Sequence, residues 1–215
     1  NRCIIPYLNE GLRMVTEGIP PSIIESAAKQ LGFPLGPIQL VDETSIELGA
    51  KIARATKAAM GELYPNEQID EILFWMEREG RLGRKAGAGF FNYNEKGKRE
   101  GFWKGLQEKY PLSKTIPEFK DVQHRLMFIQ ALEAVRALEE GVLMDIREGD
   151  VGAILGWGFA PWSGGPLSWL DILGTPYAAE RCQALCETYG PRFECPPLLA
   201  DMGKKNEAFY KRFSP

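Results

Sequence analysis

Few side chains in this 215-residue sequence could carry chemistry, and they are scattered along it. His124 is the only histidine, and an imidazole is the side chain whose ordinary pKa suits a general base near neutral pH. The sequence offers no evident carboxylate or nucleophile as its companion. His124 is therefore either a general base or a structural residue, and the missing companion favours the structural role.

A glycine-rich segment, "GRKAGAGFF" at 83–91, could bind a phosphate because glycine lets backbone amides approach an anion closely. It lacks the third glycine of a G-x-G-x-x-G fingerprint and the G-K-[ST] ending of a nucleotide loop. We favour a structural turn that packs its aromatic residues onto helices. Those aromatic residues are Phe90, Phe91 and Tyr93.

Charged side chains give further candidates, each with a structural alternative. Arg81, Arg84 and Lys85 could contact an acidic group such as a coenzyme phosphate, although a solvated basic loop is the favoured interpretation. Asp42 and Asp171 each follow an apolar run and could be catalytic carboxylates. We expect each instead to cap or anchor a helix after its Gly-Pro turn.

The cysteines do not predict a metal site. Cys182 and Cys186 lie one helical turn apart, but there is no second pair, and one histidine cannot complete four ligands. Buried small hydrophobic residues are the favoured interpretation. Four irregularly spaced cysteines also fit a reducing compartment better than a disulfide scaffold.

Two uncharged features complete the set of candidates. The aromatic segment "GWGFAPWSGGP", at 156–166, could line an apolar pocket, or it could fix a bend between core helices, which we favour. Asn1 carries an amide that donates and accepts but does not titrate, so it could orient a substrate oxygen but could not abstract a proton. Its spacing alone predicts the N-cap of the first helix.

Composition excludes several classes of protein. A formal net charge of −3 argues against nucleic acid as the main partner, because phosphate binding needs a basic face. No apolar run approaches the roughly 18–20 residues that span a bilayer, and no signal peptide is recognisable.

The apolar spacing predicts helices nearly throughout, and no β-α-β alternation is present. The first helix has an apolar stripe at intervals of three and four residues. Its members are Ile5, Leu8, Leu12, Val15 and Ile19. Gly32 is predicted to end the next helix in a left-handed conformation, and "GFFNYNEKGK", at 89–98, to form a short hairpin or an ordered loop. The predicted fold class is all-α.

Two parts of the chain are alike. "NRCIIPYLNEGLRMVTEGI" matches "HRLMFIQALEAVRALEEGV", which begins at His124, and "GFPLGPIQLVD" is answered by "GFAPWSGGPLSWLD". Because two motifs recur in the same order, a duplication is the preferred explanation. It predicts a first unit at 1–93, a connector at 94–116 and a second unit at 117–215.

These motifs resemble the C-terminal helical region of the 3-hydroxyacyl-CoA dehydrogenase family over essentially the whole chain. The similar segments are "NRCIIPYLNEGLRMVTEG", "GFPLGPIQLVD" and "GRKAGAGFFNY", and the second copy resembles the extra repeat of multifunctional fatty-acid β-oxidation enzymes. The sequence departs from the family pattern at packing and turn positions. There, Gly11 replaces alanine, Glu25 replaces aspartate, Ser45-Ile46-Glu47 replaces Gly-Leu-Asp, and Phe91 replaces tyrosine.

The resemblance implies an oxidoreductase that oxidises 3-hydroxyacyl-CoA to 3-oxoacyl-CoA with NAD. In such an enzyme an upstream nucleotide-binding domain supplies the glycine loop, the His-Glu acid/base pair and a serine, and holds NAD. The helical region covers the acyl-CoA, and Asn1 matches the asparagine that it contributes to catalysis. His124 matches Asn1 in the repeat and inherits no such role. We therefore expect this chain to be the C-terminal part of a larger enzyme, to bind no cofactor or metal, and to be inactive alone.

The resemblance also implies that the two helical units pack against each other as a pseudo-dimer, which would leave the chain a monomer. The terminal "RFSP" is not a peroxisomal signal, so a cytoplasmic enzyme is expected. Two alternatives stay open. One is a non-catalytic helical association module, and the other is the helical domain of another β-hydroxyacid dehydrogenase.

Overall fold

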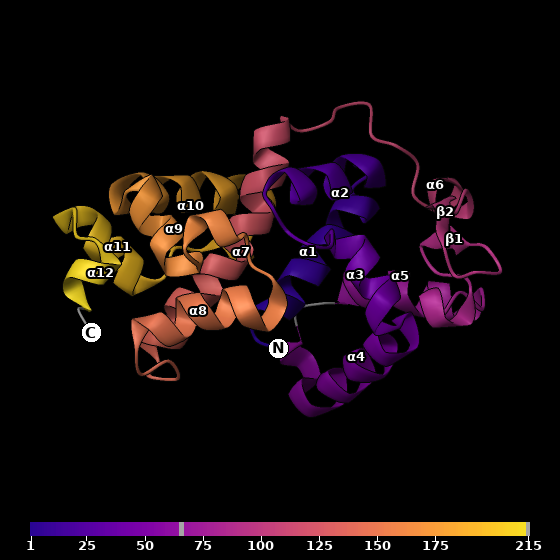
Figure 1. The fold of residues 1–215 in the computed structure, drawn as a ribbon, viewed down its shortest axis with the longest axis horizontal. Helices are drawn as coiled ribbons and strands as arrows, with labels where there is room; N and C mark the ends of the chain where they lie inside the picture. Colours follow the sequence, from indigo (N-terminus) through magenta and orange to yellow (C-terminus); the bar gives the residue numbers. More distant parts are fainter. Residues whose placement is uncertain (65–66, 214–215) are drawn as a thin grey trace. The chain divides into compact units, whose positions relative to one another are not determined.

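The computed structural model describes residues 1–64 and 67–213, which are mostly helical (Figure 1). In chain order the α-helices are α1 (Ile4–Thr16), α2 (Pro21–Gln30), α3 (Pro37–Thr44), α4 (Ile46–Met60), α5 (Glu67–Arg78), α6 (Gly105–Lys109), α7 (Phe119–Glu139), α8 (Ile146–Trp157), α9 (Pro166–Leu173), α10 (Thr175–Tyr189), α11 (Pro197–Lys205) and α12 (Phe209–Arg212). Short 3-10 helices are η1 (Gly61–Leu63), η2 (Arg84–Ala86), η3 (Pro161–Ser163) and η4 (Pro191–Phe193). The predicted helical class is confirmed.

The chain forms two compact units, and neither is one continuous segment. The amino-terminal unit holds the described residues of Leu8–Ala28 and Leu35–Phe119. The carboxy-terminal unit holds Asn1–Tyr7, Lys29–Pro34 and the described residues from Lys120 onward. The first residues of the chain therefore pack with the segment that begins at Lys120. The sequence boundaries at 94–116 divide the chain by homology, and they remain a prediction.

The amino-terminal unit packs α4 against α5 and α3 against α4. Its apolar core includes Ile24, Ile38, Ile72, Met76 and Phe90, which are fully or almost fully buried. Gly11 lies where α1 meets the start of α3, and a Cβ atom there would lie 2.5 Å from Pro37 Cγ. This close approach explains why glycine replaces the family's alanine at this position.

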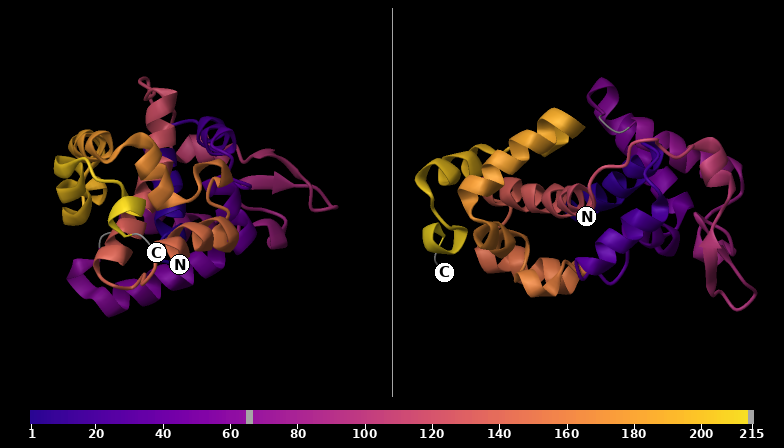
Figure 2. Two further views of the ribbon diagram at one scale, coloured as in Figure 1. Left: turned by 60° about the vertical axis from the view of Figure 1, so that its left-hand side comes forward. Right: turned by 90° about the horizontal axis from the view of Figure 1, so that it is seen from above.

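The predicted hairpin is confirmed in the same unit. Strands β1 (Phe91–Tyr93) and β2 (Arg99–Phe102) pair antiparallel, with Phe91 opposite Phe102. The side chains of this pair contact each other at 4.1 Å between ring centroids. Figure 2 shows the turn of the hairpin projecting away from the helices of its unit.

The carboxy-terminal unit is built around α7, whose residues from Leu126 to Leu132 are buried on all sides. Helices α8 and α9 pack together, α10 packs along α11, and α12 contacts α9 (Figure 1). The segment Lys29–Pro34 joins this core through Phe33, which stacks with Tyr7 at 5.0 Å and meets the edge of Phe159 at 5.5 Å.

Proline and glycine fix several helix ends. Pro21, Pro37 and Pro166 occupy the first position of α2, α3 and α9, where the missing N–H has no helical partner to lose. Gly32 has a φ of +90°, so the predicted left-handed end of the second helix is confirmed. Among residues 1–64 and 67–213, no helix is both long enough and apolar enough to cross a membrane.

Candidate functional site

Asn1 lies at the amino-terminal end of α1, with an exposed side chain. Its backbone carbonyl accepts a hydrogen bond from the N–H of Ile5 at 3.0 Å, which closes the first turn ahead of the helix. Because α1 begins at Ile4, this bond holds Asn1 in a turn just ahead of the helix, and its role as an N-cap stays a prediction. The residue lies at the end of α1 that carries the positive end of the helix dipole.

The next residue, Arg2, is tied to α7 by a two-pronged ion pair. Its Nη1 and Nη2 atoms donate to the two carboxylate oxygens of Glu140 at 2.6 and 2.8 Å, and its Nε donates to Glu133 at 3.1 Å. The bond from Glu140 raises the pKa of Arg2, and the same bond lowers the pKa of Glu140. Both groups are therefore charged over the whole physiological range of pH.

Glu133 is itself fixed by further contacts in the carboxy-terminal unit. Arg136 Nη1 donates to its second carboxylate oxygen at 2.5 Å, and Arg136 Nη2 donates to the carbonyl of Glu194 at 2.9 Å. A chain of charge-assisted hydrogen bonds thus runs from residue 2 through α7 to the segment after η4.

Cys3 follows directly and could suggest a nucleophile. Burial, with a smaller contribution from the charge of Glu133, raises the pKa of Cys3 to about 11. Because the thiolate is the reactive form, this thiol is inert at neutral pH. The amide of Asn1 is therefore the functional group that this end of the helix offers.

The glycine-rich loop is filled by a carboxylate of the chain itself. The N–H groups of Phe90 and Phe91 donate to the two oxygens of Asp42 at 2.8 and 3.0 Å, and the Tyr93 hydroxyl donates at 2.8 Å. A Cβ atom on Gly89 would collide with this carboxylate, and one on Gly83 would lie 2.6 Å from the Asp42 carbonyl oxygen. The glycines make room for Asp42, and the amides that could hold a phosphate are already occupied.

The arginines of this loop are also bound internally. Arg81 donates to the carbonyls of Gly89 and Phe91 at 2.7 and 3.0 Å, and Arg84 donates to Glu43 at 2.8 Å. Lys85 is exposed. The structural role of the loop is thus supported by its contacts, and the loop does not fit a dinucleotide phosphate.

Asp171 repeats the role of Asp42 in the carboxy-terminal unit. Its carboxylate accepts from the N–H groups of Phe209 and Tyr210 at 2.6 and 3.1 Å, and so holds the start of α12. Burial is the main cause of a raised pKa at both Asp42 and Asp171. As expected, each carboxylate is an anchor, but its target is a segment far along the chain, not the end of its own helix.

A second pair of anchors was not found from the sequence. Glu25 on α2 accepts from the N–H groups of Ile38 and Gln39 at 2.9 and 3.1 Å, and Asp150 on α8 accepts from the two matching residues of α9. Helices α3 and α9 begin with Gly-Pro, which supplies no capping side chain. A glycine at this position cannot accept from the first N–H groups of the helix, so the sequence did indicate that a distant side chain must do so.

His124 is a structural residue. It is 8 % exposed, and its Nδ1 accepts a hydrogen bond from Arg181 Nε at 2.9 Å. Burial, followed by the charge of Arg181, lowers the pKa of His124 to about 4. A neutral imidazole with a cation on its acceptor nitrogen cannot take a proton from a substrate at neutral pH, so the base interpretation is excluded.

The remaining candidates also serve structure. Trp162 Nε1 donates to the Leu31 carbonyl at 2.6 Å and Trp157 Nε1 donates to Gln130 at 3.0 Å, so the aromatic segment fixes a bend. Cys182 is buried and Cys186 half-buried. In the part of the chain that the structure describes, no group of three or more potential ligands is placed to hold a metal ion.

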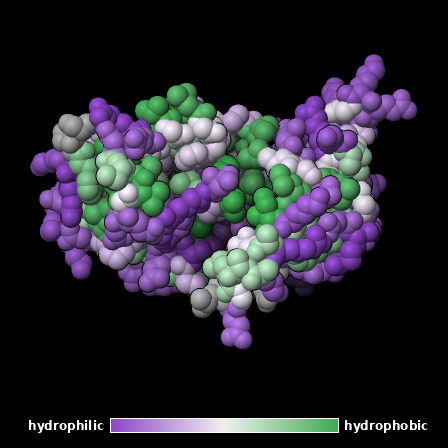
Figure 3. Space-filling model, turned by 90° about the horizontal axis from the view of Figure 1, so that it is seen from below, coloured by the Kyte–Doolittle hydropathy of each residue, from purple (hydrophilic) through white to green (hydrophobic). Residues whose placement is uncertain are grey.

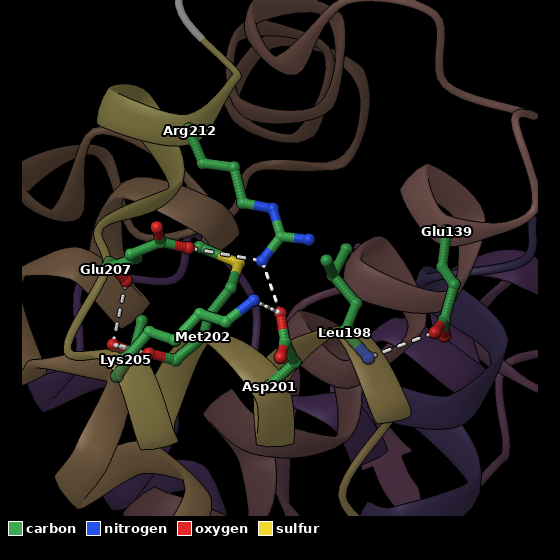
Figure 4. A network of polar contacts seen from close by, with 8 residues as sticks. Glu139, Leu198, Asp201, Met202, Lys205, Glu207 and Arg212 are labelled. Atoms are coloured by element: carbon green, nitrogen blue, oxygen red, sulfur yellow. Dashed lines mark hydrogen bonds and ion pairs between the residues drawn. The ribbon is translucent and has the colours of Figure 1, made fainter.

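An open pocket of about 400 Å³ lies beside α11 and α12. Figure 4 shows Arg212 reaching Asp201 and Glu207 there, while Glu139 accepts from the N–H of Leu198. Arg212 is thus paired with carboxylates and Glu139 with a backbone N–H, so the charged groups of the pocket serve to hold the structure together.

Comparison with known proteins places these features in a family. Residues 1–93 match the sequence model described as 3-hydroxyacyl-CoA dehydrogenase, C-terminal domain. The fold resembles that of a 3-hydroxybutyryl-CoA dehydrogenase from Escherichia coli, with a TM-score of 0.67 and 18 % identity over 95 % of this chain and 59 % of that one. It also resembles the dehydrogenase part of multifunctional enzyme 1 from C. elegans, with a TM-score of 0.68 and 24 % identity over 94 % of this chain and 46 % of that one.

The chain thus spans about half of the length of the solved dehydrogenases whose fold it shares. The resemblance read from its motifs is confirmed: residues 1–93 match the 3-hydroxyacyl-CoA dehydrogenase C-terminal domain family, and the chain has the helical fold seen in these dehydrogenases.

Proposed function

We propose that this chain is the helical, acyl-CoA-binding part of an NAD-dependent 3-hydroxyacyl-CoA dehydrogenase that works in fatty-acid β-oxidation. The observation that carries the proposal is the family match over residues 1–93, which begins at an exposed asparagine whose backbone carbonyl accepts from the N–H of Ile5, just ahead of α1. This placement leaves the amide free to face a substrate held outside the helix.

The chemistry available to Asn1 is positional and electrostatic. Its side-chain amide can donate a hydrogen bond to the oxygen at C3 of the acyl group, which gains carbonyl character during oxidation. A fixed donor of this kind favours the correct orientation of the reacting carbon without transferring a proton itself. The acid/base group belongs elsewhere in this proposal, because His124 is buried and neutral.

NAD accepts the hydride in this reaction, and the described residues do not fit it. The loop amides of Phe90 and Phe91 are taken by Asp42, and Arg81 is bound to backbone carbonyls. We therefore assign NAD to a nucleotide-binding domain that acts together with this chain. The solved dehydrogenases contain about as much chain again as this one covers, which leaves room for such a domain.

We further propose that the chain is a tandem repeat whose copies pair within one molecule, so that it acts as a monomer. Two pairs of equivalent anchors support the duplication, namely Asp42 with Asp171 and Glu25 with Asp150. The pairing remains a proposal, since the ion pair between Arg2 and Glu140 joins two segments of the carboxy-terminal unit.

Turnover by the complete gene product tests the proposal. We expect it to reduce acetoacetyl-CoA with NADH, followed as loss of absorbance at 340 nm, while residues 1–215 alone stay at the blank rate. Asn1→Ala should lower kcat by about 10²–10³-fold, the usual cost of one donor to a developing oxyanion. Gln107→Ala, which removes an exposed amide on α6, is the matched control. Full activity of Asn1→Ala would rule out the proposed role of the amide.

An association module is the second candidate, favoured by exposed apolar side chains on two helices. Leu48 and Ile52, four residues apart on α4, are 50 % and 45 % exposed, and Val151 and Leu155 on α8 are 53 % and 80 % exposed. Figure 3 shows hydrophobic surface among charged surface in both units. Such surface suits contact with another polypeptide. An association module would show no turnover and no dependence on Asn1 in the same assay.

A further inference from the structure

The residues just ahead of α1 are held by the second half of the chain, and this contact affects the position of the Asn1 amide. Asn1–Tyr7 belong to the same compact unit as α7, although they precede it by more than a hundred residues. Within this segment, Arg2 makes a bidentate pair with Glu140 and a further bond to Glu133. Asn1 is joined to Arg2 by a planar peptide bond, and its carbonyl accepts from the N–H of Ile5 at 3.0 Å, so holding Arg2 limits how far Asn1 can move.

An ion pair this exposed contributes little to folding stability. The side chains of Arg2 and Glu140 are 38 % and 53 % exposed, and pairs of this kind are weakened by water and salt. What a bidentate arginine–carboxylate contact does supply is orientation, because both planar groups are fixed by two parallel bonds. The geometry of this contact is therefore its most useful property.

Glu133 adds a firmer second point. It is 19 % exposed, and Arg136 holds its other oxygen at 2.5 Å. Arg136 is in turn bonded to the carbonyl of Glu194. Arg2 is thus attached both to the exposed end of α7 and, through Glu133, to the buried part of the carboxy-terminal unit.

We propose that Glu140 and Glu133 are positioning residues of the dehydrogenase, because they hold Arg2 and thereby aim the Asn1 amide at the acyl-CoA oxygen. The second repeat then takes part in catalysis, although it carries no catalytic residue of its own. The inference rests on the proposed function, since it needs Asn1 to face the substrate. Misplacement of a catalytic group by about 1 Å can lower a rate by 10²-fold, so a loosened Arg2 has a measurable consequence.

The test uses the complete gene product with acetoacetyl-CoA and NADH. We expect Glu140→Gln to lower kcat about tenfold and to change KM by less than twofold. Arg2→Lys, which keeps the charge but loses the fork, should give a similar loss. The exchange Arg2→Glu with Glu140→Arg should recover part of kcat. Asp201→Asn is the matched control, because Arg212 also binds two carboxylates, at 2.6 and 3.2 Å, and is similarly exposed at 33 %.

A double-mutant cycle separates positioning from a general loss of structure. If Glu140 acts through Asn1, Glu140→Gln should have no further effect on kcat once Asn1 is alanine. Unchanged kcat in Glu140→Gln, or a loss that simply multiplies with that of Asn1→Ala, would overturn the inference. If Asn1→Ala itself is fully active, the proposed function fails instead, so the two failures are distinguishable.

Discussion

The anchors at Asp42 and Asp171 perform the same task in different surroundings. Each carboxylate lies near the end of a short helix and binds two successive N–H groups far along the chain, 48 residues away for Phe90 and 38 for Phe209. Asp42 is 1 % exposed and also binds the Tyr93 hydroxyl, whereas Asp171 is only half-buried. The comparison shows that a sequence can keep the contact while the enclosed chain changes, from α4, α5 and the glycine loop in one case to α10 and α11 in the other.

The largest expected effect is a loss of folding stability when either anchoring carboxylate is removed, and the two losses should differ because the two sites differ in burial. Asp42→Ala leaves two N–H groups without an acceptor in a dry site, so we expect the free energy of unfolding to fall by about 4 kcal/mol. Asp171→Ala should cost only about 2 kcal/mol, because water can reach the freed groups. Urea unfolding of both variants measures the ratio. Equal losses would contradict the role assigned to burial.

The stability of the folded chain is expected to depend on pH through His124, the residue that aligns with Asn1 in the proposed repeat. The folded-state pKa of His124, about 4, lies below the unfolded value of 6.5. Its contribution to stability is therefore fully present above pH 6.5 and is lost as the pH falls toward 4. The loss is roughly 3 kcal/mol at most.

Asn at position 124 keeps an acceptor for Arg181 but does not titrate. His124→Asn should therefore flatten the stability profile between pH 4.5 and 6.5, measured by urea unfolding at several pH values. The carboxylates titrate in both proteins, so the difference between the two profiles isolates the imidazole. Parallel profiles would show that His124 is not protected from protonation.

The smallest effect is expected from exchanging Ser45 and Gly174, the residues that directly follow α3 and α9. Their backbone angles are nearly identical, with φ of 82° and 83° and ψ of 121° and 126°. This region strains a residue that has a Cβ atom. Ser45→Gly should raise stability by about 1 kcal/mol even though Ser45 accepts a weak bond from Leu48 N–H at 3.4 Å. Gly174→Ser should lower it, and calorimetry of both variants checks the opposite signs.

Local features of this fold were predictable from sequence, whereas the long-range contacts were not. The helical stripes, the hairpin and the left-handed Gly32 follow from spacing and from glycine and proline chemistry, and each is confirmed. The sequence also indicated that Asp42 and Asp171 are anchors. It could not indicate what they bind, because a bond across 48 residues leaves no periodic signal.

The candidate site divides in the same way. Asn1 was identified by resemblance, and its spacing placed it near the start of the first helix, just ahead of which it lies. The attachment of Arg2 to Glu140 depends on how the first residues pack with α7, which neither composition nor periodicity records. The role of the glycine loop likewise depends on a distant residue, because the Asp42 carboxylate occupies the amides of Phe90 and Phe91.

The bond between the Asp42 carboxylate and the N–H groups of Phe90 and Phe91 also indicates where extra residues can be inserted into the chain. It fixes two points of the chain and leaves the path between them free to vary in length, at an entropic cost of only roughly 0.6 kcal/mol per doubling of a flexible loop. The exposed turn at Gly61, which follows α4, lies inside this interval. An epitope or fluorescent reporter grafted there would leave both the Asp42 contacts and the first residues of the chain intact, and so offers a way to label the protein without altering Asn1.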